Sequence, residues 1–226
     1  MKHLSPNVIS FLKDLRANNS REWFQENKKR YQQAKKDFEA FITEVLGVLG
    51  EHENLTGLRP KDVVFRIFRD IRFSPDKTPY KVNMSASISK GGRKSSYHPF
   101  YIHLEPEGRS FIGGGSWAPS SEQLAKMRQE IDYNADELKG IVETPAFKKA
   151  FGALGGEKLK TSPRDYPADH PEIELLRHKQ FVVSTEIPAN LLQRDALLDF
   201  ILEHYLLMQP FLKFLDYVLV EELEEG

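Results

Sequence analysis

The residues from 63 to 74 alternate between apolar and charged side chains, and this alternation constrains the fold more than any other feature of the sequence. In an extended strand, successive side chains point to opposite faces. One face then carries Val63, Phe65, Ile67, Ile71 and Phe73, and the other carries Arg66, Asp70 and Arg72. Such a strand is typical of an antiparallel sheet with one face on the core and the other in solvent. Arg69 falls on the apolar side, which indicates a bulge or the end of the strand.

A charged, proline-rich turn follows this strand. Residues 74 to 79 contain two prolines, which lack a backbone donor and favour extended conformations in the residue before them, so we expect a stiff loop. From Phe65 to Lys81 the chain carries five cationic and two anionic side chains. Guanidinium groups suit bidentate binding of phosphate or carboxylate, and ammonium groups act as point charges. The sequence therefore predicts an anion site with these candidate contacts: Arg66, Arg69, Arg72, Lys77 and Lys81.

An internal salt-bridge network is the alternative interpretation of the same charges. In that case Asp70 and Asp76 pair with the arginines and brace the loop, within a structural or protein-interaction domain. The count over residues 59 to 94, ten basic against three acidic side chains, slightly favours the anion site. The sequence leaves both interpretations open, and Asp70 and Asp76 belong to the candidate site.

The composition limits the class of protein and of partner. The chain has 32 basic and 33 acidic residues and a pI near 6.7, so it lacks the positive field of a dedicated nucleic-acid binder. A small anionic ligand or a nucleotide is therefore the expected partner, and nucleic acid stays open without support from the net charge. No cysteine occurs, which excludes disulfides and is typical of a reducing compartment. No segment approaches the roughly 18–20 apolar residues of a membrane span, so we expect a cytoplasmic protein without a membrane partner.

Helical patterns occupy both ends of the chain. Ser5 followed by Pro6 is typical of a helix start. Asn19 precedes Glu22 by three positions, the spacing of a capping box, and the apolar periodicity beyond it predicts one long helix. A C-terminal helix is expected from Asn190 onward.

Strand patterns fill the middle of the chain. Strict alternation at 84–89 places three serines on one face, and two further patterns flank a short turn as in a hairpin. The predicted strands, about five in all, are 63–74, 84–89, 98–105, 109–116 and 181–187. Together with the helices they predict an α+β fold, a single domain over residues 1–226. Its mainly antiparallel sheet is expected to pack against long N-terminal and C-terminal helices.

The polar sides of neighbouring strands extend the candidate site. Tyr101 and His103 share one face of their strand, and Tyr80 lies beside the cationic turn, so these three are expected to line the ligand. If the register aligns the polar sides, they form a concave floor, and otherwise they form an ordinary solvated face. The residues of this floor are Arg66, Asp70, Ser85, Ser87, Tyr101 and His103.

Three consecutive glycines, at 113 to 115, precede Trp117 and a helix start at Ser120, with Gln123 three residues later. A glycine run weakens a strand unless a backbone or a ligand approaches closely. Backbone N–H groups at a helix start can hold an anion, so Gly114 and Trp117 are candidate ligand contacts. A kink at the end of the strand is the alternative.

The motifs of familiar enzyme classes do not occur in the sequence. There is no GxSxG motif and no cysteine-based signature. The seven histidines are scattered, and His98 and His103 point to opposite faces of their strand. We therefore expect no metal and no cofactor, and no catalytic residue is predicted, although Asp70 or Asp76 is placed where a general base would be useful.

Four segments stand in order along almost the whole chain: FLKDLRANNSREWFQENKKRY, FRDIRFSPDKTPYK, GGGSWAP and HPEIELLRHKQF. Together they resemble the uncharacterised, mostly bacterial domain of unknown function family 2461. The string RDxRFSxDKTPYK is long and unusual, which makes the resemblance specific. The resemblance implies that residues 69–81 and the turn at 18–27 are features of the family. It implies no activity and no catalytic set.

Overall fold

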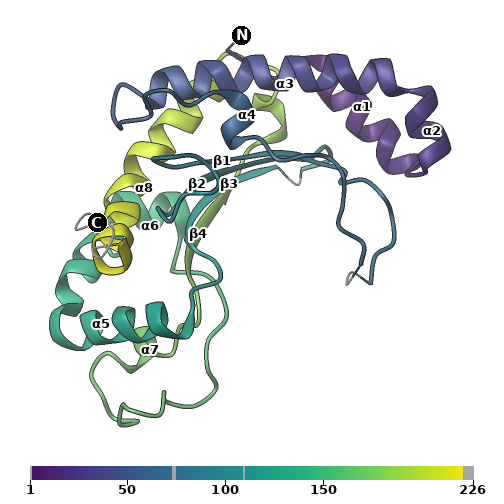
Figure 1. The fold of residues 1–226 in the computed structure, drawn as a ribbon. Helices are drawn as coiled ribbons and strands as arrows, with labels where there is room; N and C mark the ends of the chain where they lie inside the picture. The colour runs from purple at the N-terminus through teal and green to yellow at the C-terminus, as the bar shows by residue number, and fades with distance from the viewer. Residues whose placement is uncertain (1, 73–74, 109, 221–226) are drawn as a thin grey trace. The chain divides into compact units, whose positions relative to one another are not determined.

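The structure is a computed structural model that describes residues 2–72, 75–108 and 110–220, and it has an α+β fold (Figure 1). Within these residues one antiparallel sheet has four strands in the order β1-β2-β3-β4. The strands are β1 Met84–Ile88, β2 Phe100–Leu104, β3 Phe111–Ser116 and β4 Phe181–Glu186. The predicted fold class is confirmed, whereas the prediction of a fifth strand at 63–74 is wrong.

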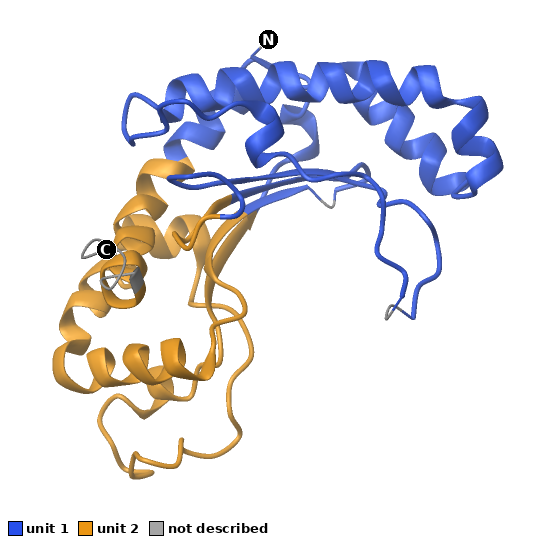
Figure 2. Cartoon of the chain, viewed as in Figure 1, with its two compact units in different colours: residues 1–94, 101–112, 186–203 blue, residues 95–100, 113–185, 204–226 orange. Residues whose placement is uncertain are grey.

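Two compact units divide the chain (Figure 2). Unit 1 comprises residues 1–94, 101–112 and 186–203. Unit 2 comprises residues 95–100, 113–185 and 204–226. The cationic segment lies in unit 1. That residues 1–226 form a single domain stays a prediction.

The first helices of unit 1 are α1 Pro6–Ala17, α2 Arg21–Glu26, α3 Lys28–Leu49 and α4 Pro60–Val63. The predicted helix start at Ser5 is confirmed, because its hydroxyl accepts a hydrogen bond from the backbone N–H of Asn7 at 3.3 Å. α1 and α3 lie side by side (Figure 1). Each buries an apolar stripe, with Phe11 on α1 and Phe38 on α3 among the buried side chains.

The single long helix predicted from Asn19 is wrong, because the chain forms two helices with a break at Asn27. Ser20 caps α2, and its hydroxyl accepts a hydrogen bond from the backbone N–H of Trp23 at 3.2 Å. Asn19 does not act as the cap, since its side-chain amide binds the backbone of Tyr80. A contact distant in sequence therefore shifts the helix start by one residue.

A buried carboxylate, Asp37 on α3, ties the start of α1 to α3. Its oxygens accept hydrogen bonds from the side-chain amides of Asn7 and Gln33 at 2.8 and 2.6 Å. Burial raises the pKa of Asp37, but hydrogen bonds from Asn7, Ser5 and Gln33 outweigh burial and lower the pKa below its usual value. Asp37 is therefore expected to stabilise the folded chain as a carboxylate.

We expect Asp37→Ala to lower the free energy of unfolding at neutral pH by about 1–3 kcal/mol, because the variant loses hydrogen bonds to a charged group. The pKa of Asp37 is lower in the folded than in the unfolded chain. Its contribution is therefore present above about pH 4 and is lost as the pH falls through the folded value. Urea denaturation of both proteins across pH should show a difference that shrinks under acidic conditions. A difference that did not shrink as the pH fell below about 4 would contradict this account.

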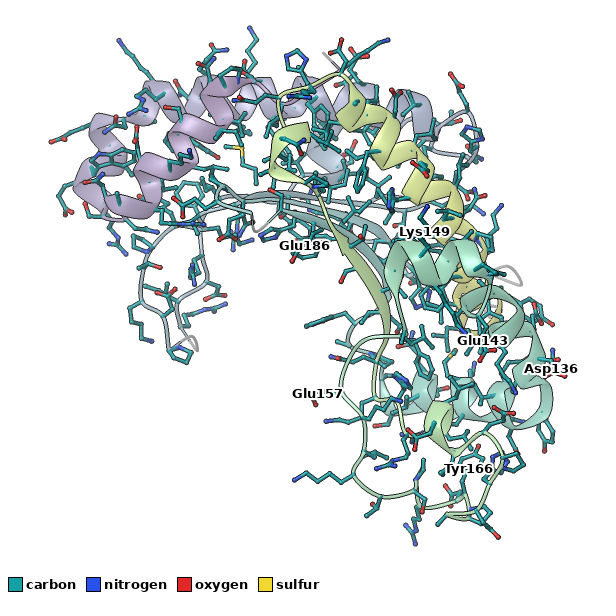
Figure 3. The ribbon with its side chains drawn as sticks, turned by 180° about the vertical axis from the view of Figure 1, so that it is seen from behind. Asp136, Glu143, Lys149, Glu157, Tyr166 and Glu186 are labelled. Carbon is teal, nitrogen blue, oxygen red and sulfur yellow. The ribbon has the colours of Figure 1, made fainter. Side chains whose placement is uncertain are left out.

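The helices of unit 2 include α5 Ser121–Val142, α6 Pro145–Phe151 and α7 Ile173–Leu176. The predicted cap at Ser120 is confirmed, since Ser120 and Gln123 form a capping box. Asp136 is exposed on the outer side of α5, and Tyr166 lies on the long loop that precedes α7 (Figure 3).

The C-terminal helix starts later than predicted. α8 spans Ala196–Val220 and follows a 3₁₀ turn, η1, at Ala189–Leu191. The predicted start at Asn190 therefore falls inside the 3₁₀ turn. None of the helices in the described ranges is both long enough and apolar enough to span a bilayer.

Candidate anion site

A two-stranded ribbon carries the candidate site, and we call residues 64–69 its first arm and residues 79–86 its second arm. Bridges from Val64 to Ala86 and from Phe68 to Tyr80 join the arms in antiparallel fashion. The ribbon belongs to unit 1, and its second arm leads into β1.

The strand predicted at 63–74 differs from the structure at both of its ends. At its start, α4 includes Val63, because Pro60 opens a helical turn and the Asp62 carboxylate accepts the backbone N–H of Arg59 at 3.1 Å. After Phe68, residues 69–72 take part in no bridge. This agrees with one of the two alternatives predicted near Arg69, the end of the strand. The apolar position predicted at Phe73 lies outside the described residues.

The pairing register of the two arms changes along the ribbon, because the second arm contains two extra residues. The backbone N–H of Phe65 donates to the carbonyl of Ser85 at 3.0 Å, and the N–H of Lys81 donates to the carbonyl of Ile67 at 2.8 Å. Between these bonds the first arm advances by two residues and the second by four. The extra residues make a bulge at Val82 and Asn83, where regular pairing is interrupted.

The alternation predicted for the first arm is only partly correct. Ile67 is buried as predicted, but Phe65 is 37% exposed. Arg69, on the same side of the arm as Phe65, turns with it toward a hollow beside the bulge, whereas Arg66 and Asp70 do not line this hollow. We predicted that Arg66 and Asp70 would contribute to the floor of the site. Phe65 and Arg69, on the opposite side of the first arm, line the hollow in their place.

The hollow has a volume of about 300 Å³. Its lining residues are Phe65, Arg69, Lys81, Asn83, Ser85 and Tyr101. The rings of Phe65 and Tyr101 meet edge to face at 6.2 Å, and Nζ of Lys81 lies 5.3 Å from the centre of the Phe65 ring. The lining thus combines two aromatic walls with two cations.

The positive charge of the hollow has little compensation. None of the described residues that line it is acidic. Burial, followed by repulsion from Arg66 and Arg69, lowers the pKa of Lys81 below its ordinary value. Arg69 has one carboxylate partner, since Nη1 lies 2.5 Å from Asp76. Its Nε is buried and has no hydrogen-bond partner within the part of the chain that the structure describes.

The other predicted anion contacts lie away from the lining. Arg72 binds Asp70 in bidentate fashion at 3.0 and 2.7 Å, and this pairing lowers the pKa of Asp70 to about 2. Nζ of Lys77 donates to the carbonyl of Ile71 at 3.0 Å, and Arg66 is exposed. The pairs of Arg72 with Asp70 and of Arg69 with Asp76 match the alternative interpretation, in which the charges brace the loop. Arg69 and Lys81 are the two predicted cations that line the hollow.

Tyr80 belongs to an aromatic cluster rather than to the lining. Its ring is 4% exposed and stacks on Phe24 of α2 at 3.9 Å. The side-chain amide of Asn19 donates to the carbonyl of Tyr80 at 2.9 Å and accepts its N–H at 3.2 Å. These contacts attach the second arm to the helices. Asn19 was missed as a site residue because its helix-cap spacing concealed this role.

The polar face of β2 behaves as a connected network. The Tyr101 hydroxyl lies 3.4 Å from Nδ1 of His103, and Nε2 of His103 lies 2.9 Å from the Glu105 carboxylate. Glu105 also pairs with Arg16 of α1. The predicted grouping of Ser85 with Tyr101 and His103 is thus present, since a hydrogen bond also joins Ser85 to Tyr101. Glu105 and Arg16 carried no signal in the sequence that linked them to the site.

The glycine run lies in unit 2 and has a packing role. A Cβ at Gly114 would lie 2.5 Å from Sδ of Met208 and 2.7 Å from the carbonyl oxygen of Pro99. Close packing of β3 therefore accounts for Gly114 without a ligand. Trp117 is 69% exposed, and neither residue lines the hollow. Among the described residues, no three histidine or carboxylate side chains converge as metal ligands.

Comparison with known proteins gives a family. The model of the family described as conserved hypothetical protein (DUF2461) matches residues 7–214, a range that contains the whole hollow. No curated protein and no solved structure matched the chain. The long match bears out the resemblance noted in the sequence, and the chain belongs to the conserved hypothetical protein family DUF2461.

Proposed function

We propose that unit 1 binds a small ligand bearing a phosphate or carboxylate group in the hollow beside the ribbon. One observation carries the proposal: Lys81 is half-buried next to Arg66 and Arg69, and among the described residues the lining offers it no acidic partner. A buried cation is costly unless a counter-charge compensates it. An anion in the hollow would supply that charge and would also give the Nε of Arg69 an acceptor.

The size and the walls of the hollow suit a small ligand. A volume of about 300 Å³ lies at the lower end of the range for small-molecule sites. Phe65 and Tyr101 offer apolar surface for the uncharged part of the ligand, and Asn83 and Ser85 offer hydrogen bonds. A nucleotide with one phosphate group has this combination of features.

Lys81→Met tests the proposal, because methionine keeps the length of the side chain and removes its charge. Thermal unfolding would be followed with inorganic phosphate, pyrophosphate and adenosine monophosphate. We expect at least one of them to stabilise the wild type through ligand linkage. The variant should bind that ligand roughly 10- to 100-fold more weakly, the loss of one hydrogen bond between charged groups. Without ligand it should be as stable as the wild type or more so, since a poorly compensated charge is gone.

Lys77→Met is the matched control, because Lys77 carries the same charge on the same segment but binds a carbonyl outside the lining. It should keep the response to the ligand. If both variants lost the response equally, the effect would come from net charge alone. If the wild type responded to none of the three ligands, the proposal would fail. The two ion pairs of the loop would then stand as a brace, and Arg72→Ala would test the pair of Arg72 with Asp70.

A further inference from the structure

A line of hydrogen-bonded side chains runs along the polar face of β2 and ends in the hollow. Tyr101 forms part of the lining, His103 follows it on the same face, and Glu105 lies at the far end. Glu105 is 9% exposed, and its other oxygen pairs with Arg16. The ring of Phe111 on β3 stacks on His103 at 4.7 Å. The line therefore joins a buried ion pair to the space in which the ligand is proposed to bind.

These hydrogen bonds determine which nitrogen of His103 carries the hydrogen. A carboxylate only accepts, so Nε2 carries a hydrogen and donates it to Glu105. In the neutral ring Nδ1 is then an acceptor, and it takes the hydroxyl hydrogen of Tyr101. Tyr101 has only this one hydrogen to give. A ligand that accepts it leaves Nδ1 of His103 open to a proton from solvent.

We infer that Tyr101, His103 and Glu105 form an acid–base unit that delivers a proton to an oxyanion bound in the hollow. The inference rests on the proposed function, because the oxyanion is the proposed ligand. It goes beyond binding, since it makes the phosphate- or carboxylate-bearing ligand a substrate for general acid catalysis. Tyr101 is the catalytic residue in this account, and His103 and Glu105 supply and position the proton.

The proton transfer balances without any further reactant. With ligand bound, Nδ1 of His103 takes one proton from solvent, and Glu105 stabilises the imidazolium. The O–H bond of Tyr101 then breaks, and its proton forms a new O–H bond with a ligand oxygen. The phenolate oxygen of Tyr101 takes the proton from Nδ1, and the ring of His103 returns to its neutral form. One proton has passed from His103 to the ligand, and Tyr101 is unchanged.

The surrounding charges couple the proton to the anion. Among the described residues, charged groups that face the unit include Arg16 on α1, Glu107 in the turn after β2, and Arg69 and Lys81 in the hollow. Arg16 binds both Glu105 and Glu107, so the charges around Glu105 change little when a ligand enters the hollow. An anion in the hollow adds negative charge beside Arg69 and Lys81 and accepts the hydroxyl hydrogen of Tyr101. Anion binding and protonation of His103 therefore favour each other.

The test uses sulfate, which keeps its charge over the whole range in which a histidine titrates. NMR would follow the ring protons of His103 against pH, with and without saturating sulfate, and His103→Gln would assign the signal. We expect sulfate to raise the titration midpoint of His103 by about one pH unit, a tenfold coupling. His3 provides an internal control, because it lies at the start of the chain and pairs with Asp195.

Tyr101→Phe distinguishes coupling through the Tyr101 hydroxyl from a direct electrostatic effect of sulfate on His103. The variant keeps the ring and both cations of the hollow but has no hydroxyl to redirect. At saturating sulfate, the shift of the His103 midpoint should fall to less than half of its wild-type size. Tyr133→Phe, at a position 79% exposed on α5, should keep the full shift.

Each other result overturns a stated part of the account. If sulfate binds and the His103 midpoint does not move, the acid–base unit is wrong and the anion site stands. If Tyr101→Phe retains the full shift, the coupling is electrostatic and Tyr101 is not its carrier, which also overturns the inference. If sulfate does not bind and phosphate ligands give no stabilisation, the inference fails together with the proposed function.

Discussion

Gly115→Ala is expected to lower the free energy of unfolding by about 2–6 kcal/mol, because overpacking and backbone strain each cost about 1–3 kcal/mol. Gly115 has φ +117°, a conformation that residues with a Cβ rarely adopt. A Cβ there would lie 2.1 Å from the carbonyl oxygen of Phe181 and 3.0 Å from Cα of Val182. Both atoms belong to the backbone of β4, which cannot withdraw without breaking its pairing with β3. Urea denaturation would measure the loss.

Gly140→Ala is the matched control, and its expected effect has the opposite sign. Gly140 lies inside α5, and a Cβ built there meets no atom within 4 Å. Alanine should raise the free energy of unfolding by about 0.5–1 kcal/mol, because glycine loses more backbone entropy in a helix. If Gly115→Ala cost less than about 1 kcal/mol, the close approach of β3 and β4 would have to be looser than described.

Phe24→Ala should cost about 3–5 kcal/mol, since it removes a large buried side chain from the centre of an aromatic cluster. Phe24 is 3% exposed. Its ring centre lies 3.9 Å from that of Tyr80, 5.0 Å from Tyr31, 5.9 Å from Phe68 and 6.3 Å from Phe11. The cluster joins three helices to both arms of the ribbon. The variant should therefore lose stability and also bind the anionic ligand more weakly.

The control for this variant is Tyr133→Ala, an aromatic deletion at an exposed position, which should change the free energy of unfolding by less than about 0.5 kcal/mol. Equilibrium denaturation gives the stability, and ligand-induced stabilisation gives the binding. A destabilised Phe24→Ala protein that bound the ligand with unchanged affinity would show that the cluster does not hold the ribbon in place.

The sequence predicted correctly those elements that depend on side chains close to one another along the chain. The helix starts at Ser5 and Ser120 follow from side chains that reach backbone donors within three residues. The strands β2 and β4 follow from alternation of apolar and polar side chains, and their burial alternates in the same way. In contrast, the helix start at Ser20 was missed, because the amide of Asn19 is engaged by a residue 61 positions away.

The sequence singled out the segment that carries the candidate site, but it predicted only some of the residues that line the hollow. The segment around Arg69 and Lys81 stood out by charge alone. Phe65 and Arg69, rather than Arg66, line the hollow. The pairing of the two arms, with two extra residues in the second, cannot be read from a single sequence. The packing role of the glycine run was likewise not predicted, because the backbones that it accommodates come from distant parts of the chain.

The amide of Asn19 has a consequence for solubility. Phe68 and Tyr80 face each other between the hydrogen bonds of Arg69 and Lys81, so the N–H and carbonyl of Tyr80 point outward from the ribbon. An outer edge with unpaired backbone groups is a template for strand addition and aggregation. The Asn19 side chain occupies both groups at this point, much as a neighbouring strand would. The side-chain amide of Asn19 thus prevents another chain from pairing with the backbone of Tyr80 at the edge of the ribbon.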